Sequence, residues 1–315
     1  MSSLPAEASS LKLLSVPTRG RKVMDLIRRN KKYIIIGLFP ALLFYIAFVI
    51  YPIGRSFYYG FFDWNGLSKP NFVGFNNFKE ILADPIFLKS FTNNMFVVVA
   101  SVFGQLPIGL IVAIILSKKL KGAKFFRSAF FMPMVMSTVV VGLLWSTILN
   151  SQAGILNTIM NNIGLGKFIQ DWLGDPKYAM LTVSGVIIWQ FIGYYMIIFL
   201  AGLQNIPEEI TEAANIDGAG PVKTLFFITL PMMWDTIMAA VVLCISGSMR
   251  SFDLVFVMTQ GGPAHATELM ATYMYNKTFS IYKYGYGSAV SLVICAISLG
   301  FILVSKILMR KKSEA

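Results

Sequence analysis

Six long apolar segments constrain the fold of this chain more strongly than any other feature of its sequence. A helix that crosses the hydrocarbon core of a bilayer needs about 20 mainly apolar residues. Only 13% of the 315 residues are charged, whereas soluble domains have roughly 25%. We therefore expect an all-α polytopic membrane protein with six transmembrane helices, which the apolar runs place at residues 33–53, 95–116, 129–149, 180–203, 232–258 and 289–308.

The basic residues lie mainly on one predicted side of the lipid bilayer. Lys and Arg are enriched in short cytoplasmic loops and therefore indicate orientation. Eight lie in the first, third and fifth loops, against seventeen in the N-terminal region, the second loop and the C-terminal region. Both termini are thus predicted to be cytoplasmic, and topology rather than nucleic-acid binding accounts for the formal charge of +12. The seventeen are Lys12, Arg19, Arg21, Lys22, Arg28, Arg29, Lys31, Lys32, Lys118, Lys119, Lys121, Lys124, Arg127, Lys306, Arg310, Lys311 and Lys312.

This orientation divides the chain into three regions. Residues 1–32 are predicted to form a basic cytoplasmic tail, residues 33–309 the six-helix transmembrane domain, and residues 310–315 a cytoplasmic C-terminal tail. The first apolar segment begins too late, and is followed by too many others, to be a cleaved signal peptide. We therefore expect it to remain as a membrane anchor.

Enzyme and metal-site patterns are missing from the sequence. It contains no GxxxxGK[ST] stretch, the Gly-rich loop that cradles nucleotide phosphates. Cys244 and Cys295 lie inside apolar runs, and His265, the only histidine, has no second ligand type arranged around it. We therefore expect a protein that is not an enzyme, has no catalytic or metal-binding residues and binds no cofactor itself.

The fourth loop, residues 204–231, departs from the basic composition of its predicted side. It has one basic residue, Lys223, and four acidic ones, Glu208, Glu209, Glu212 and Asp217. Asn205 can cap a helix with Glu208 three residues later, and Gly218 and Gly220 can end it. On this pattern alone, a helix that docks on a partner and a helix that lies at the membrane surface are equally good interpretations.

A longer motif favours docking. Glu-Ala-Ala is followed after three residues by Gly, after nine more by Ile, and after one more by Leu-Pro, at Glu212, Ala213, Ala214, Gly218, Ile228, Leu230 and Pro231. This spacing resembles the EAA signature of permease subunits of ABC importers. Further similarity to the first of the two permeases of carbohydrate importers lies in residues 72–82, 126–145, 154–160 and 251–267.

The resemblance implies a type I ABC importer permease fold in the cell membrane of a prokaryote. It implies that the chain forms a path for a carbohydrate, an oligosaccharide, through the membrane. This path would open alternately to the two sides of the membrane. The implied partners are a second homologous permease in a heterodimer, separate ABC ATPase subunits that bind ATP and Mg, and an extracytoplasmic solute-binding protein. The coupling residues would be Glu208, Glu209, Glu212, Ala213, Ala214, Asp217, Gly218, Ile228, Leu230 and Pro231.

A self-sufficient channel or secondary transporter is the alternative. Such proteins ordinarily place coupling acids or broken helices at mid-membrane. The predicted spans carry few acids, and these lie near the ends, at Asp235 and Asp253. The importer interpretation is therefore the leading one.

Polar residues in the fifth predicted span are candidates for the substrate path. Cys244, Ser248 and Ser251 recur at helical spacing, with Gly247 beside them. Taken alone, small residues at this spacing favour close helix packing. The resemblance aligns these positions with ones that contact sugar in the maltose permease, although Cys and Ser replace several amides.

Two further groups complete the candidate site. Trp189, Gln190 and Tyr194 in the fourth span combine aromatic surface with hydrogen-bonding ends, which suits sugar rings. Core or interfacial aromatic residues are an equally good interpretation without the family match. Arg250 and Asp253, three residues apart, are predicted either as an ion pair within one helix, which we favour, or as a gate.

Overall fold

The computed structural model of the protein describes residues 31–118 and 120–313. The chain forms two compact units, Met1–Arg55 and Ser56–Ala315. Residues 1–30 of the predicted basic tail, and the last two residues of the predicted C-terminal tail, lie outside the described part.

The described part of the first unit is helical. It comprises α2 (Lys31–Tyr45), the π-helix η1 (Ile46–Ile50) and the start of α3 (Tyr51–Tyr59). Residues Ile36–Tyr59 together are long and apolar enough to cross a membrane. The first predicted span thus has a helical counterpart.

The second unit opens with a small hairpin and a short helix. Strands β1 (Phe62–Asp63) and β2 (Asn71–Phe72) pair antiparallel, and α4 (Asn76–Ala83) follows. The buried Asn77 side chain donates to the carbonyl oxygens of Gly60 and Phe62 at 2.9 and 3.0 Å, so it ties the hairpin to α4.

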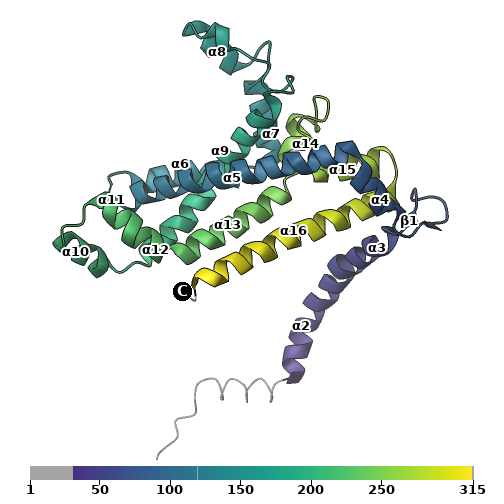
Figure 1. The fold of residues 1–315 in the computed structure, drawn as a ribbon, viewed down its shortest axis with the longest axis horizontal. Helices are drawn as coiled ribbons and strands as arrows, with labels where there is room; N and C mark the ends of the chain where they lie inside the picture. Colours follow the sequence, from purple (N-terminus) through teal and green to yellow (C-terminus); the bar gives the residue numbers. More distant parts are fainter. Residues whose placement is uncertain (1–30, 119, 314–315) are drawn as a thin grey trace, which may run out of the picture. The chain divides into compact units, whose positions relative to one another are not determined.

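Long apolar helices form the body of the second unit (Figure 1). They are α5 (Pro85–Ser117), α9 (Ala179–Gln204), α13 (Trp234–Met249) and α16 (Tyr284–Ser313). Gly109 lets α5 approach α9 closely, because a Cβ atom there would lie 3.1 Å from the backbone nitrogen of Met196. Helix α16 continues to Ser313, so the region 310–315 that was predicted as a C-terminal tail begins within this helix.

Two of the predicted spans are broken rather than straight. Helices α6 (Ala123–Val135) and α7 (Thr138–Ile148) meet at 96°, so a continuous helix over 129–149 is wrong. Pro133 removes a backbone donor in the last turns of α6. Among the described residues, four helical stretches are long and apolar enough to span a membrane, or up to six if each bent pair counts as one span. The four are Ile36–Tyr59, Pro85–Ser117, Ala179–Gln204 and Tyr284–Ser305.

The second break lies at the start of α13. The stretch Pro221–Met232, made of α11 (Pro221–Thr224), the π-helix η3 (Leu225–Thr229) and α12 (Leu230–Met232), meets α13 at 69°. At its other end α13 stops at Met249, and α14 (Asp253–Met258) is a separate helix. The prediction of one helix over 232–258 is therefore wrong at its far end.

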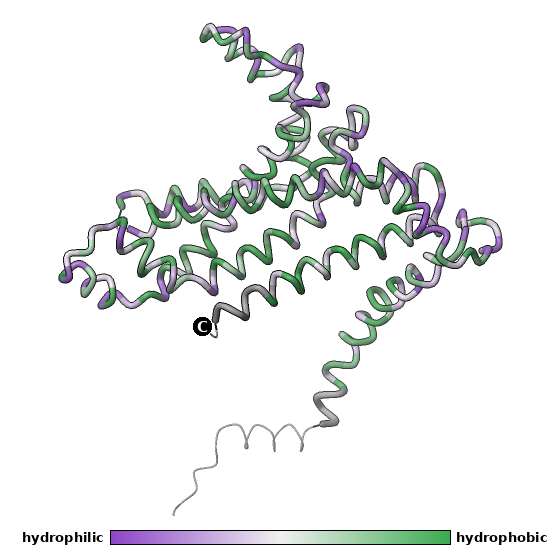
Figure 2. The backbone as a smooth tube through the Cα atoms, viewed as in Figure 1, coloured by the Kyte–Doolittle hydropathy of each residue, from purple (hydrophilic) through white to green (hydrophobic). Residues whose placement is uncertain are grey.

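Short helices fill the connections. These are α8 (Ile155–Asn162), the 3₁₀ helix η2 (Gly166–Phe168), α10 (Glu208–Ile216), α15 (Met270–Tyr275) and the π-helix η4 (Asn276–Ser280). Hydropathy follows the architecture, with apolar residues along the long helices and polar ones gathered at the connections (Figure 2).

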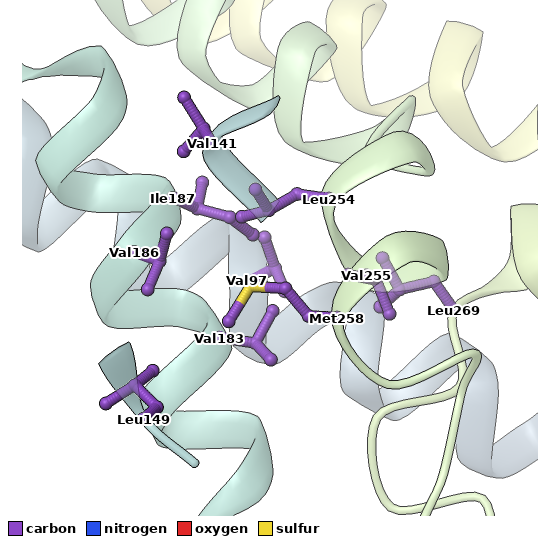
Figure 3. Packing of buried hydrophobic residues seen from close by; sticks show 10 residues of the cluster. All are labelled: Val97, Val141, Leu149, Val183, Val186, Ile187, Leu254, Val255, Met258 and Leu269. Atoms are coloured by element: carbon purple, nitrogen blue, oxygen red, sulfur yellow. The ribbon is translucent and has the colours of Figure 1, made fainter. Parts of the chain in front are cut away.

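Buried apolar residues join helices that are distant in sequence. In one cluster Val97 of α5, Val141 of α7, Val183 of α9 and Leu254 of α14 pack together (Figure 3). Two further clusters lie along α5, one with α9 and α13 and one with α15 and α16. The core thus fixes α14 against α7 and α9 although the chain breaks between α13 and α14.

A polar network closes the start of α5. Asp84 caps this helix by accepting from the Ile86 N–H at 2.8 Å, and it also accepts from Tyr273 Oη at 2.6 Å and Lys277 Nζ at 3.3 Å. Burial alone raises the pKa of the Asp84 carboxyl, but the hydrogen bonds from Tyr273, Ile86 and Lys277 outweigh burial and leave the pKa below its ordinary value. Asp84 is therefore held as a carboxylate.

Candidate functional site: a polar cavity and an exposed loop helix

A cavity of about 340 Å³ is lined by residues of α5, α6, α7, α9, α13 and α14 and of the link between α13 and α14. Its volume falls in the range of roughly 300–1,000 Å³ that is typical of small-molecule sites. The lining combines aromatic rings, hydroxyl groups and one amide with apolar side chains. The lining residues are Gln105, Met134, Thr138, Ile187, Phe191, Tyr194, Tyr195, Leu243, Cys244, Gly247, Ser248, Arg250, Ser251, Phe252, Asp253 and Leu254.

Most of the predicted path and gate residues meet at this cavity. Seven of the nine line it, and they are Tyr194, Cys244, Gly247, Ser248, Arg250, Ser251 and Asp253. The cavity lining has one cationic side chain, Arg250, and one anionic side chain, Asp253. The formal charges of the lining therefore cancel. That balance suits an uncharged polar ligand better than an anionic one.

The end of α13 differs from the prediction in one respect that shapes the cavity. Because the helix stops at Met249, Ser251 does not share a helix face with Cys244 and Ser248. Residues 250–252 instead form a non-helical link that lines the cavity.

Arg250 and Asp253 do not form the ion pair that we favoured. Arg250 is the first residue of this link and Asp253 the first residue of α14, and no salt bridge joins these two described residues. The Nε of Arg250 donates instead to the carbonyl oxygen of Ser246 at 3.2 Å. Pairing within one helix is thus wrong, and their role as a gate stays a prediction.

Asn94 of α5 holds this end of α13 in place. Its completely buried side chain donates from Nδ2 to the Ser248 carbonyl oxygen at 3.3 Å and accepts from the Met270 N–H at 2.8 Å. One amide therefore connects the cavity wall to the first turn of α15. Asn94 was not predicted as a site residue. Its position next to the predicted span 95–116 was the only indication in the sequence, because polar residues at a span are often functional.

Gln105 is a cavity residue that the sequence did not single out. Its Nε2 lies 3.2 Å from Ser101 Oγ and 3.4 Å from the Ile187 carbonyl oxygen, and its Oε1 lies 3.7 Å from Cys244 Sγ. The amide thus bridges α5, α9 and α13 beside the cavity. Ser101 and Gln105, four residues apart, were a visible signal on one face of the second span.

The two remaining predicted path residues, Trp189 and Gln190, do not line the cavity. Gln190 is only 1% exposed, and its Nε2 lies 3.4 Å from Oγ1 of Thr138, which does line the cavity. Its buried Oε1 has no hydrogen-bond partner. Trp189 packs edge-to-face on Trp145, with ring centroids 5.3 Å apart. Neither Trp189 nor Gln190 is a lining residue.

The loop helix predicted from the acidic motif exists as α10. Glu208 and Glu209 occupy its first turn, where the helix dipole favours acids. Asn205 does not cap it, because Asn205 ends α9 and Pro207 occupies the N-cap position. Ala214 is buried against the unit, whereas the predicted coupling side chains Glu212, Ala213 and Asp217 are exposed, as is Gly218.

The helix ends where predicted. Gly218 has φ +76°, and its N–H donates to the Asn215 carbonyl oxygen at 3.1 Å while the Ala219 N–H donates to that of Ala214 at 2.9 Å. These bonds form a Schellman motif, which favours glycine at this position. The remaining motif residues follow, with Ile228 in η3 and Leu230 and Pro231 in α12.

Within residues 31–118 and 120–313, no group of three or more His, Cys, Asp or Glu side chains could hold a metal ion. The described part of the site thus offers polar binding surface and an exposed helix.

Much of the chain matches a known protein family. Residues 105–312 match the family described as "Binding-protein-dependent transport system inner membrane component". The probable ABC transporter permease protein YurN of Bacillus subtilis (strain 168) is 37% identical over 282 residues, which cover 89% of this chain and 96% of YurN.

Other relatives carry sugar-related descriptions. The diacetylchitobiose uptake system permease protein NgcF of Streptomyces coelicolor is 35% identical over 82% of this chain and 76% of NgcF. The multiple sugar-binding transport system permease protein MsmF of Streptococcus mutans is 33% identical over 88% of this chain and 94% of MsmF.

Solved structures share the fold. A chain of a bacterial ABC transporter involved in the import of the acidic polysaccharide alginate has a TM-score of 0.79 at 21% identity, covering 92% of this chain and 99% of its own. A chain of the alginate transporter in complex with an alginate pentasaccharide-bound periplasmic protein also has a TM-score of 0.79, at 20% identity, covering 93% of this chain and 99% of its own.

Proposed function

Because the chain belongs to the family of binding-protein-dependent transport system inner membrane components, we propose that it forms the translocation route of an ABC importer for an oligosaccharide. The chain is a multi-pass membrane permease subunit and not an enzyme. The descriptions of its relatives favour a carbohydrate substrate.

The cavity is the observation that carries this proposal. Aromatic faces from Phe191 and Tyr194 would stack on sugar rings, while Gln105, Thr138 and Ser248 would hydrogen-bond hydroxyl groups. The balanced charge of the lining favours a neutral sugar. In this assignment the substrate path comprises Tyr194, Cys244, Gly247, Ser248 and Ser251, with Trp189 and Gln190 supporting the wall, and Arg250 and Asp253 form the gate.

The exposed α10 is proposed as the coupling element. Since the sequence has no phosphate-binding loop, ATP and Mg would bind to separate ABC ATPase subunits that contact this helix and its motif residues. To move the permease from a mostly inward-open to a mostly outward-open population, a partner must bind the outward-open state more tightly by about 5 kcal/mol. ATP binding to the partner would supply that energy.

The other partners and the orientation complete the proposal. A second homologous permease would form a heterodimer with residues 33–309 of this chain, and an extracytoplasmic solute-binding protein would deliver the sugar. Both termini, including the tails at 1–32 and 310–315, would lie in the cytoplasm of a prokaryotic cell, because the basic residues are concentrated on that side.

A first experiment is purification of the tagged chain from its native membrane, with the bound proteins identified by mass spectrometry. Recovery of a second permease and an ATPase is the expected result. Secondary transporters also contain broken helices, so gradient-driven transport by the purified chain alone would favour that alternative.

A second experiment tests the coupling helix directly. We expect Glu212→Lys and Gly218→Val to abolish uptake while the chain still inserts into the membrane. Gly164→Val is the matched control, because Gly164 has φ +78° and, as at Gly218, nothing lies within 4 Å of the place that a Cβ atom would take. Both glycine variants bear a similar backbone strain of about 1–2 kcal/mol. Normal uptake by both α10 variants, or equal loss in the control, would contradict coupling through α10.

A further inference from the structure

The turn between α5 and α6 is strongly basic and has no acidic counterpart nearby in sequence. Residues 117–126, called the basic turn here, read SKKLKGAKFF and contain four lysines. No Asp or Glu occurs anywhere in residues 85–170. The charge of the turn is therefore not neutralised by its own segment.

Backbone contacts shape the basic turn on both sides of Lys119, which lies outside the described residues. Gly122 adopts φ +85°, and the Ala123 N–H donates to the Leu120 carbonyl oxygen at 3.2 Å. Arg127 of α6 reaches back, and its Nη2 donates to the Leu116 carbonyl oxygen at 2.6 Å. This bond satisfies an otherwise open carbonyl at the end of α5.

These contacts leave the lysines pointing outward beside apolar side chains. Lys118, Lys121 and Lys124 are exposed, and each is absent from the salt bridges found among the described residues. Phe125 and Phe126 are 72% and 50% exposed next to them. The surface thus combines positive charge with aromatic rings.

The position of the basic turn indicates that it lies at the membrane surface. The apolar run of α5 continues to Leu116 without a charge after Lys89, so the lysines begin where this candidate membrane span ends. The turn also lies at the same end of the helical body as α10 and α11 (Figure 1). Basic clusters directly beyond a spanning helix attract anionic lipid, and aromatic residues prefer the membrane interface.

We propose that the basic turn binds the phosphate headgroup of anionic phospholipid at this face of the membrane. Lys118, Lys121 and Lys124 hold the headgroup, and Phe125 and Phe126 lie among the upper parts of the acyl chains. The site is separate from the cavity and does not depend on the transported substrate. It would give the permease a preference for phosphatidylglycerol over zwitterionic phospholipids.

The test is a lipid titration of the full chain, purified with its bound subunits and followed by native mass spectrometry. Short-chain phosphatidylglycerol and phosphatidylcholine are the two probes. We expect tighter binding of phosphatidylglycerol, weakening as salt rises. The variant Lys118→Gln/Lys121→Gln/Lys124→Gln should lose about five-fold in affinity per charge, or roughly 100-fold in all. The corresponding Lys→Arg variant should retain binding.

A matched control removes three exposed lysines elsewhere, as Lys69→Gln/Lys79→Gln/Lys167→Gln, and should bind phosphatidylglycerol normally. Because loop lysines also influence insertion, Phe125→Ser/Phe126→Ser provides a second variant that keeps the charge; it should bind both lipids more weakly. Equal affinity for the two lipids, or an equal loss in the control, would overturn the proposal. So would a Gln variant that keeps phosphatidylglycerol but loses a bound subunit, since the turn would then be a protein contact.

Discussion

Gly193 provides a sharp test of how α9 packs. A Cβ atom at this position would lie 2.0 Å from the Phe130 carbonyl oxygen and 2.8 Å from the Phe131 Cα. Both of these atoms belong to the backbone of α6, so no side-chain rotation can relieve the overlap. Gly193→Ala must therefore move α6 away from α9 or distort one of them.

The expected cost follows from the size of this overlap. The Cβ atom would be about 1.4 Å too close for an ordinary contact of roughly 3.4 Å or more. Overpacking of a core typically costs 1–3 kcal/mol and occasionally more, whereas Gly→Ala inside a helix by itself contributes about 0.5–1 kcal/mol of stability. A net destabilisation of about 1–2 kcal/mol or more is therefore expected for Gly193→Ala.

Gly185→Ala is the matched control on the same helix, because nothing lies within 4 Å of the place that a Cβ atom would take at Gly185. Thermal unfolding of the full chain in detergent, followed by loss of the monodisperse peak in size-exclusion chromatography, measures both variants. At about 2 °C per kcal/mol for a chain of this size, the two midpoints should differ by about 4 °C or more, with the control at or above wild type. Equal midpoints would refute the close approach of α6 and α9.

Two other perturbations test polar contacts. Asn94→Ala leaves the Met270 N–H and the Ser248 carbonyl oxygen without their buried partner, so we expect a loss of about 1–3 kcal/mol in thermal unfolding and weaker sugar binding than in Asn93→Ala. Asp84→Asn should lower the midpoint at pH 7, because the pKa of Asp84 is depressed in the folded state. That stabilisation is present above the unfolded-state pKa of about 3.9 and is lost as pH falls further, so the variant and wild type should converge at acid pH; a constant difference would contradict this assignment.

Residue patterns alone predicted the membrane-spanning character and the loop helix. Each of the six apolar runs is mainly helical in the structure, although two of them are broken. The Gly218 stop was also predictable, because a left-handed residue after a helix favours glycine. The N-cap was not, since Asn205 is used to end α9 and Pro207 occupies the cap.

The broken spans could not be read from hydropathy. A sliding apolar window does not distinguish a straight helix from two helices meeting at an angle, and 129–149 remains apolar through its break. Within 232–258 the break falls at the polar residues Arg250 and Ser251, but polar residues in a predicted span do not by themselves show that the helix stops. Likewise Asn94 and Gln105 have partners on helices far away in the sequence. Only the packing of α5 against α9, α13 and α15 gives these amides their positions.

The break after Met249 is itself an argument for the proposed site. Within an apolar helical body, non-helical backbone is tolerated where it is buried in protein or lines an aqueous cavity. Arg250, Ser251 and Phe252 meet that condition, because all three line the cavity. A straight helix through Met258 would continue the hydrogen-bond ladder and leave no such link. The interruption therefore brings Arg250 and Ser251 to the cavity that Ser248 and Gln105 also line, as a route for a hydroxyl-rich substrate requires.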